Sequence, residues 1–461
     1  MSSERDPVAV AAVKMRAAGQ TDEAIRTFSS ALERVRSGAQ TRIPSADLEP
    51  AAGVPALAEL PDADPAEALA DVAMIKLNGG LATSMGLHQP KSLVEAREGR
   101  SFLEIIIGQT LALRRRCGVR LPLVLMNSDA TRQPTAEAMA EHPEIALDGL
   151  PLDFLQSMVP KLDAETMLPA SWPEDPGLEW NPPGHGDVYA ALRGSGMLAT
   201  LLEHGFRYAM ISNADNLGSM VDARIAAHMA RERIPFLMEV VQGTEADRKG
   251  GHIARRRRDG QLVLRETAQT PEDDQESFRD YRRWRYYNTN SLWVDLPALE
   301  DILSGGGLEL PVIVNRKTVD PRDASSPPVL QLESAMGAAI ASFAQASLLL
   351  VPRTRFAPVK TTDDLLVLRS DVYTLDEDCR VLPLAERASA LPYVELDSRY
   401  YKLLDEFERR FPEGPPSLRE AERLVVHGDV TFGRGVSVRG NVELDADRPE
   451  RLADGTVLGD G

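Results

Sequence analysis

The stretch MIKLNGGLATSMGLHQPKSLVE, Met74 to Glu95, is the part of the chain around which the fold is organised. An apolar run from Val72 to Leu77, with one lysine in it, predicts a buried strand of an α/β sheet. Small residues follow the strand, among them Gly79 and Gly80, and they allow backbone N–H groups to approach a ligand closely. Lys91 comes shortly after them. A strand that runs into a glycine-rich turn, with a lysine beyond it, is typical of phosphate binding.

This loop is neither of the two common phosphate-binding motifs. No glycine directly precedes Lys91, which excludes a Walker loop, and the spacing G-x-G-x-x-G is absent. Gly79 and Gly80 alone are equally compatible with a plain surface turn. Lys91 and Ser92 favour the phosphate-binding interpretation.

Composition and charge limit the function classes. The chain has 461 residues, enough for two or three units, and its 43% hydrophobic and 26% charged residues are those of an ordinary globular protein. The formal net charge of -18 argues against nucleic-acid binding by a basic surface. An anionic substrate therefore needs a local cluster of positive groups.

Cysteine content and hydropathy indicate a cytoplasmic protein. The two cysteines, Cys117 and Cys379, argue for a reducing compartment and against a disulfide framework or a cysteine-built zinc site. No apolar run approaches the roughly 18 residues of a membrane span, and the N-terminus lacks the pattern of a signal peptide. We expect no membrane partner.

Three regions follow from the pattern along the chain. Residues 1–65 are expected to form a helical segment, with helix over 5–37 and a break at Gly19-Gln20, followed by a connector rich in Pro, Ala and Asp over 39–65. Residues 66–373 alternate strands and helices, which predicts a mostly parallel mixed sheet with helices on both faces. Residues 374–461 end in short β runs separated by glycines, typical of one or two turns of a left-handed β-helix.

The expected elements of the middle region can be placed by residue. The strands are expected at Val72–Leu77, Leu121–Met126, Leu152–Phe154, Tyr208–Ile211, Pro235–Val241 and Leu348–Val351. The helices are expected at Phe102–Arg116, Asp187–Glu203, Asp222–Arg231 and Leu332–Phe343. Between Gly251 and Trp293 the pattern favours an antiparallel excursion. Ligands of such sheets lie beyond the carboxyl ends of the strands, which is where the glycine loop falls.

Two further stretches have side chains suited to a nucleotide. In Asn181-Pro182-Pro183-Gly184-His185-Gly186-Asp187 a rigid loop enters a helix, and His185 can donate to a phosphate or a base; Asp187 alone is also a plain N-cap. Ser212-Asn213-Ala214-Asp215 follows an apolar strand, where a carboxylate commonly holds Mg²⁺ beside phosphates, although Asp and Asn also simply end strands.

Polar residues later in the chain complete the candidates. Asn288 and Asn290 offer amides beside a strand and suit sugar hydroxyls. Glu333 lies where a helix is expected to begin. Lys360, in PVKTTDD, is a second lysine before a helix start, and its alternative is a solvated helix-start residue.

Taken together, these stretches resemble the UTP–glucose-1-phosphate uridylyltransferase family. The motifs that carry the resemblance are LNGGLATSMG with PKS, FLQSMVPKL, PPGHGDVY, SNADNLG, YYNTNSLW, QLESAMGAAI and PVKTTDDLL, in the family's order from about Val72 to Tyr373. The resemblance implies a nucleotide-diphospho-sugar transferase type of fold with a β-helix appendix. It implies transfer of a uridylyl group from UTP to glucose 1-phosphate with Mg²⁺. A related UDP-sugar or UDP-N-acetylhexosamine pyrophosphorylase, or a catalytically silent nucleotide-sugar-binding protein, are the alternatives.

The resemblance also implies roles for single residues. The loop Leu77, Gly79, Gly80 and Ala82 corresponds to the nucleotide cradle, with Lys91 on the phosphates. Gln156 corresponds to the glutamine that binds uracil, Gly184 lies against the base and His185 near phosphate. Asp215 holds Mg²⁺ beside Asn213. Asn288, Asn290 and Glu333 face the sugar, and Lys360 is the second phosphate lysine.

The chain departs from the family pattern at two places. Ala82 stands where the family has a glycine, so the loop is less permissive there. The β-helix after Val425 has only a turn or two, from which we expect a monomer or a weak homo-oligomer.

Overall fold

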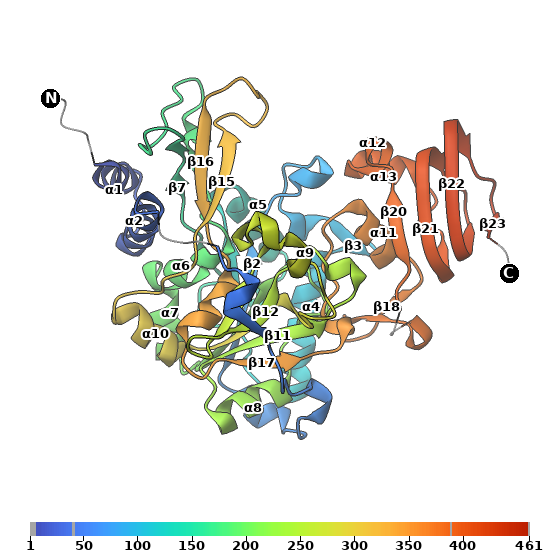
Figure 1. Cartoon of the computed structure of the whole chain (residues 1–461). Helices are drawn as coiled ribbons and strands as arrows, with labels where there is room; N and C mark the ends of the chain where they lie inside the picture. Colours follow the sequence, from blue (N-terminus) through green and yellow to red (C-terminus); the bar gives the residue numbers. More distant parts are fainter. Residues whose placement is uncertain (1–5, 39–41, 388–389, 460–461) are drawn as a thin grey trace.

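The computed structural model describes residues 6–38, 42–387 and 390–459. Two N-terminal helices lie at one end of the molecule and a parallel sheet formed by the C-terminal residues lies at the other, with a large sheet between them (Figure 1). Helix α1 spans Pro7–Ala17 and helix α2 spans Asp22–Arg36, which confirms the two N-terminal helices and the break between them. Residues 1–5, 39–41 and 460–461, parts of the predicted terminal regions, lie outside the described residues.

A mixed sheet of ten strands forms the centre of the molecule, in the order β1-β12-β14-β10-β2-β5-β6, with β13 beside β12, and β11 between β14 and β17. β10, β2, β5 and β6 are parallel neighbours, and β17 joins β11 in parallel. The long strand β14 pairs antiparallel with β10, β11 and β12. The strands are β1 Leu48–Pro50, β2 Val72–Asn78, β5 Leu123–Asn127, β6 Asp153–Leu155, β10 Tyr208–Asn213, β11 Phe236–Gln242, β12 His252–Arg256, β13 Leu262–Arg265, β14 Tyr286–Asp295 and β17 Ser347–Leu350.

These strands confirm the predicted α/β class. All six predicted strands are present. The antiparallel excursion expected between Gly251 and Trp293 is also present, as β12, β13 and β14, and β14 extends two residues further, to Asp295. The predicted connector over residues 39–65 also contributes a strand to the central sheet, because β1 pairs with β12 at the edge of the sheet.

Helices cover both faces of the sheet. The side chains of a strand alternate between its two faces, and in β2 the side chains on both faces are apolar, so each face is covered by helices. Val72 and Met74 of β2 pack with apolar residues of α4 and α8. Ala73 and Ile75 pack with residues of α6, α7 and α10 on the opposite face. All four side chains are fully buried, so β2 contributes to the apolar core on each face of the sheet. The helices are α4 Phe102–Cys117, α6 Val188–Gly194, α7 Met197–Glu203, α8 Ala223–Glu232 and α10 Leu296–Ser304.

The predicted helix over Leu332–Phe343 is wrong at its start. Leu332 and Glu333 belong to strand β16, Pro328–Glu333, which pairs antiparallel with β15, Ile313–Thr318. Leu332 is buried against the N-terminal helices, so pairing and packing together favour the strand. A 3-10 helix follows over Met336–Ser342.

Two other helices differ from the prediction. The helix expected over Asp187–Glu203 is divided into α6 and α7, because Ser195 and Gly196 interrupt it. Helix α5, Asp129–Ala140, was not predicted because it contains Pro134, which removes one helical hydrogen bond.

The C-terminal residues form a parallel sheet of four strands: β20 Tyr393–Leu396, β21 Ser417–Thr431, β22 Ser437–Arg451 and β23 Val457–Leu458. Ser417 pairs with Ser437 and Thr431 with Arg451, so after β21 the chain turns back to the level where β21 began and runs parallel to it as β22. The sheet shares the larger of the apolar cores with the central sheet, through residues such as Leu418, Leu424 and Phe432.

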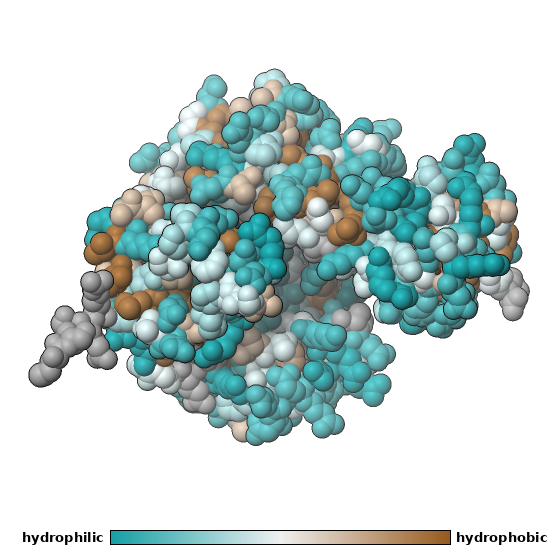
Figure 2. Space-filling model, turned by 90° about the horizontal axis from the view of Figure 1, so that it is seen from above, coloured by the Kyte–Doolittle hydropathy of each residue, from teal (hydrophilic) through white to brown (hydrophobic). Residues whose placement is uncertain are grey.

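Short elements complete the chain. The remaining strands are β3 Glu95–Arg97, β4 Arg100–Ser101, β7 Val159–Pro160, β8 Leu162–Asp163, β9 Trp180–Asn181, β18 Tyr373–Leu375 and β19 Val381–Pro383. The remaining α-helices are α3 Pro65–Ala68, α9 Gln275–Phe278, α11 Thr362–Arg369, α12 Ser398–Tyr401 and α13 Leu404–Arg410. Within the described ranges no helix is long and apolar enough to cross a membrane. On the face seen in Figure 2 the hydrophobic residues form small separate groups.

Candidate active site

A cavity of about 280 Å³ lies beyond the carboxyl ends of the parallel strands β2, β5, β6 and β10. Nine of the predicted site residues line it: Leu77, Gly79, Gly80, Lys91, Gln156, Gly184, His185, Asn213 and Asp215. The parallel strands explain this convergence, because their carboxyl ends meet at one edge of the sheet. Stretches far apart in the sequence are therefore brought to one place.

The glycine loop folds back so that Lys91 stands over its beginning. The backbone N–H of Lys91 donates to the carbonyl of Gly80 at 3.1 Å, and Leu81 forms a β-bridge with Pro90. A Cβ atom on Gly79 would lie 2.6 Å from Oε1 of Gln156, so only glycine allows this glutamine to lie against the loop. Ala82 is fully buried behind the loop and does not line the cavity.

The two most strongly predicted charged residues contact each other. The Nζ atom of Lys91 lies 2.8 Å from Oδ2 of Asp215, and each side chain is only 19% exposed. Because their charges cancel, this cavity is not the strongly basic site that two anionic substrates require. Within the described part of the chain, Oδ1 of Asp215 is buried and accepts no hydrogen bond.

A divalent cation fits this donor set. Oδ1 of Asp215 is a hard oxygen ligand without a hydrogen-bond partner among the described residues, and Asp215 and Asn213 both line the cavity. A cation with oxygen ligands often takes one or two protein carboxylates and completes its coordination with phosphate and water. One bound cation also supplies the positive charge that the Lys91–Asp215 pair lacks.

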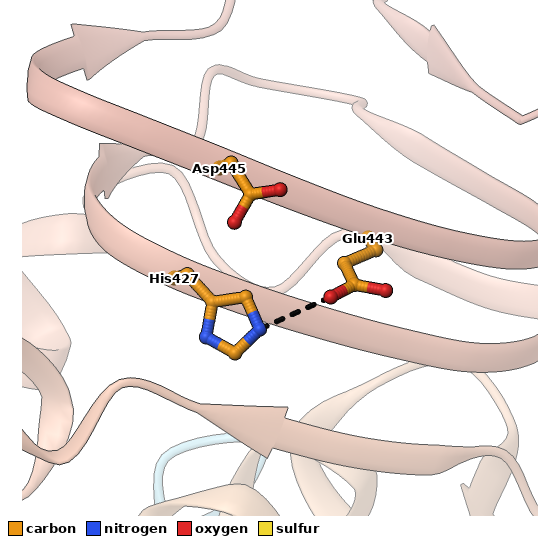
Figure 3. A group of neighbouring side chains, drawn as sticks. All are labelled: His427, Glu443 and Asp445. Carbon is orange, nitrogen blue, oxygen red and sulfur yellow. Dashed lines mark hydrogen bonds and ion pairs between the residues drawn. The ribbon is translucent and has the colours of Figure 1, made fainter.

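Among the described residues, three side chains of the C-terminal sheet form the one group of His, Cys, Asp or Glu side chains with metal-ligand spacing. His427, Glu443 and Asp445 lie on β21 and β22, and Nε2 of His427 is 3.2 Å from Oε1 of Glu443 (Figure 3). All three are exposed on the C-terminal sheet, and none lines the cavity at Asp215.

The His185 imidazole is held neutral in one tautomer. Burial lowers the pKa of His185 to about 4, and its Nδ1 accepts the backbone N–H of Met336 at 3.0 Å. Nε2 therefore carries the proton and is a hydrogen-bond donor. Gly184 precedes it with a φ of 80°, and a Cβ atom there would lie 2.5 Å from the carbonyl oxygen of Ser334, so glycine is required.

Asp187 connects this loop to the segment of Gln156. Its carboxylate accepts the backbone N–H of Ser157 at 2.5 Å and makes no hydrogen bond to the N-terminus of α6. Burial raises the pKa of Asp187 to about 6. The side chain therefore orients the residue next to Gln156 rather than capping the helix.

The remaining predicted residues lie around the cavity, outside its lining. Asn288 and Asn290 lie two residues apart on β14, and Nδ2 of Asn288 donates a hydrogen bond to Oδ1 of Asn290 at 2.8 Å. Because Ser291 pairs with Ser212, Asn290 lies near the carboxyl end of β10. Glu333 ends β16, where its Cβ lies 3.2 Å from the position of a Cβ on Gly184.

Lys360 is exposed at the rim. The backbone N–H of the preceding Val359 donates to the carbonyl of Asp215 at 3.2 Å, which brings the lysine segment beside the Asp215 loop. Burial raises the pKa of Glu266 to about 7, and the positive charge of Lys360 opposes this increase. The Lys360 side chain is therefore exposed to solvent but close enough to Glu266 to affect its pKa.

Sequence reasoning missed several lining residues. Asn78, Ser92, Met126, Pro182 and Ala214 also line the cavity. Asn78, Ser92 and Ala214 adjoin predicted site residues and Pro182 is two positions before Gly184, so a wider window would have included these four. Met126 has no polar signal and is found only through its place at the end of β5.

A buried lysine lies directly behind the site and predicts a pH-dependent stability. Lys76 is fully buried, and its Nζ donates to Oγ of Ser212 at 2.8 Å. Burial lowers its pKa to about 7 from the ordinary 10.5. Between these values the unfolded chain binds a proton that the folded chain does not, so stability rises with pH above about 7.

Comparison with Lys76→Met isolates this contribution. In metal-free buffer, the wild-type free energy of unfolding relative to Lys76→Met is expected to rise between pH 7 and pH 9, by at most about 1.4 kcal/mol per pH unit. Urea unfolding of both proteins at several pH values measures it. Parallel pH profiles would show that Lys76 keeps its proton when folded.

The fold and the cavity are those of an α/β protein whose ligand site lies beyond the carboxyl ends of its parallel strands, between the loops that follow β2 and β10. The family model of UTP–glucose-1-phosphate uridylyltransferase matches residues 25–439. A probable enzyme of that name from Schizosaccharomyces pombe is 39% identical over 390 residues, covering 84% of this chain and 76% of its own. The barley (Hordeum vulgare) enzyme is 39% identical over 401 residues, covering 86% and 82%.

A solved structure agrees over the whole chain. A variant of UDP-glucose pyrophosphorylase from Leishmania major, in complex with UDP-glucose, matches with a TM-score of 0.93 and 42% identity, covering 100% of this chain and 99% of its own. The chain belongs to the UTP–glucose-1-phosphate uridylyltransferase family.

Proposed function

We infer that the protein transfers a uridylyl group from UTP to glucose 1-phosphate, giving UDP-glucose and pyrophosphate. One observation carries this function: in a chain of this family, nine of the predicted substrate residues line one cavity at the carboxyl edge of the parallel strands. A pyrophosphate-release assay of UTP against CTP, TTP and ATP, with several sugar 1-phosphates, tests it. The expected result is a clear preference for UTP with glucose 1-phosphate. A preference for an N-acetylhexosamine phosphate, or no pyrophosphate at all, would favour one of the two alternatives.

The roles of the lining residues are part of the same proposal. The Gly79–Gly80 loop and Lys91 bind the triphosphate, and Gln156 and Gly184 bind the base. The Nε2 proton of His185 is directed to a phosphate oxygen. Asn288, Asn290 and Glu333 face the sugar, and Lys360 approaches from the rim. The lining residues are supported by their place in the cavity. The other four are supported by their place beside it: Asn290 near the carboxyl end of β10, with Asn288 hydrogen-bonded to it, Glu333 against Gly184, and Lys360 next to Val359, which bonds to Asp215.

We propose Mg²⁺ as the divalent metal, held by Asp215 with Asn213 nearby. When bound, it supplies positive charge to the phosphates of UTP. This agrees with the electrostatics of the cavity, where the single lysine is neutralised by the same aspartate.

The chemistry requires positioning and charge neutralisation rather than a strong base. An oxygen of glucose 1-phosphate attacks the α-phosphorus of UTP in line, and pyrophosphate leaves. That oxygen is already deprotonated at neutral pH, because the second pKa of a phosphate monoester is about 6. The barrier comes from bringing one anion onto another, so Lys91, Lys360 and the loop N–H groups lower it by neutralising charge in the right geometry.

Gln156 is predicted to determine the choice of base. Its amide offers a donor and an acceptor that match the uracil edge, and it lies against Gly79 in the cavity. Gln156→Leu keeps the size of the side chain and loses both hydrogen bonds, so we expect kcat/KM for UTP to fall at least ~10-fold. Steady-state kinetics with UTP and CTP measure this change. Unchanged discrimination between the two would remove Gln156 from the base site.

We propose further that the protein is cytoplasmic, that its regions divide at residues 65 and 373, and that the C-terminal parallel sheet is a short left-handed β-helix.

We expect a monomer or a weak homo-oligomer, because the β21–β22 coil leaves little surface for stacking. Light scattering at micromolar concentration measures the mass. A stable octamer would contradict this expectation.

A further inference from the structure

The loop that carries Asp215 and the segment that carries Lys360 are joined by the backbone and by one side chain. The backbone N–H of Val359 donates to the carbonyl of Asp215 at 3.2 Å, and Asn216 forms a β-bridge with Pro358. The side chain is that of Asn216. Asn216 is 2% exposed. Its Nδ2 donates to the carbonyl of Arg355 at 3.0 Å, and its Oδ1 accepts the backbone N–H of Ala357 at 3.1 Å. The side-chain amide thus pairs with the Lys360 segment as a neighbouring strand would, and uses both its donor and its acceptor to do so.

Arg355 anchors the same segment to strand β11 of the central sheet. Its guanidinium binds the buried carboxylate of Glu239 at 2.7 and 2.6 Å, and also donates to the carbonyl of Met220 at 2.7 Å. Glu239 accepts a further hydrogen bond from Nε1 of the fully buried Trp293 at 2.9 Å. A bidentate arginine–carboxylate pair fixes direction as well as distance, so Arg355 is held rigidly on β11.

The two backbones touch closely where they are joined. A Cβ atom on Gly218 would lie 2.3 Å from the carbonyl oxygen of Thr354, a contact that no other residue type permits without movement. The loop clamp, defined here as Asn216, Arg355 and Glu239, therefore connects the Asp215 loop, the Lys360 segment and the central sheet.

We propose that Asn216 is a positioning residue of the transferase reaction. Its amide sets the distance between Lys360 and Asp215, and hence between the second lysine and the metal-bound phosphates. This inference rests on the proposed roles of Asp215 and Lys360. Asn216 is adjacent to Asp215, and its amide makes two hydrogen bonds to the segment that leads to Lys360. Loss of the amide leaves the Val359 backbone hydrogen bond as the nearest restraint on Lys360, so the lysine segment is held less exactly while no substrate-binding group is removed.

Asn216→Ala in the full chain tests the proposal, with Ser219→Ala as the matched control. Ser219 lies in the same loop and is equally buried, and its hydroxyl shares a hydrogen bond of 2.6 Å with the hydroxyl of Ser291 rather than with the Lys360 segment. We expect Asn216→Ala to lower kcat ~10- to 100-fold, because small misplacements of a catalytic group cost that much. The dissociation constant of UTP, measured by calorimetry, should stay within about threefold. Ser219→Ala should keep kcat within about threefold.

A double-mutant cycle separates positioning from general stability. If Asn216 acts by placing Lys360, then Asn216→Ala added to Lys360→Ala should change kcat by less than about threefold. Gly218→Ala, which pushes the same two backbones apart, should reproduce the kcat loss. It replaces Asn216→Ala as the test variant if Asn216→Ala does not fold. An unchanged kcat in both variants, an additive cycle, or the same loss in Ser219→Ala would overturn the proposal. A wild-type enzyme that makes no UDP-glucose would instead contradict the proposed function.

Discussion

Asp215→Ala is expected to lower turnover by at least about 1,000-fold, the upper end of the effect of removing one group that neutralises transition-state charge. Two losses combine in this variant. The carboxylate whose Oδ1 has no hydrogen-bond partner among the described residues is the one proposed to hold the metal. The same carboxylate pairs with Lys91 at 2.8 Å and orients it toward the phosphates. Turnover is measured by pyrophosphate release over a range of Mg²⁺ concentrations.

Asp215→Asn is the matched control, because it keeps the shape of the side chain and loses only the charge. Both variants should keep the wild-type thermal unfolding temperature within a few degrees, since Asp215 lies in a loop. Binding of Mn²⁺ in the presence of UTP, followed by electron paramagnetic resonance, gives a readout other than activity. Wild-type Mn²⁺ affinity in both variants would remove Asp215 from the metal site.

Lys360→Ala is expected to lower kcat about 30- to 1,000-fold and to leave UTP affinity within a few-fold. The side chain is exposed at the rim and forms no ion pair with the described residues. It is therefore free to engage the phosphates only when both substrates are bound and their charges come closest. An interaction made only in the transition state changes kcat rather than binding.

Lys91→Ala gives the contrasting result. Lys91 lines the cavity and stands over the Gly80 carbonyl, so it should contact the triphosphate of UTP before the reaction. We expect both UTP affinity and kcat to fall in this variant. Calorimetric titration with UTP beside steady-state kinetics separates the two lysines. A Lys360→Ala enzyme with near-normal kcat would make Lys360 a solvated helix-start residue.

The parallel part of the fold and most of the cavity could be predicted because their signals are local. β2 is a short apolar run followed directly by Gly79 and Gly80, and the strand before Asp215 has the same form. When such strands are parallel neighbours, their carboxyl ends must meet. The position of each loop in sequence therefore predicts its place in the molecule.

What could not be predicted depends on contacts between distant residues. β16 is stable only beside β15 and the N-terminal helices, and β15 has the weakly apolar sequence IVNRKT, so neither strand has a clear pattern of its own. The pairing of Lys91 with Asp215 joins positions 124 apart. Asn216 appears in sequence as one more polar loop residue, and its function as a connection emerges only when Arg355 and Ala357 lie beside it.

The central claim is that two anionic substrates react directly in one cavity where their charges are neutralised, without a covalent uridylyl enzyme. Exchange of labelled pyrophosphate into UTP tests this most directly, with enzyme freed of bound sugar nucleotide and supplied with Mg²⁺. The account predicts no labelled UTP when neither glucose 1-phosphate nor UDP-glucose is present, and rapid labelling once UDP-glucose is added. Labelled UTP formed without either sugar compound would require a covalent intermediate and would contradict the account.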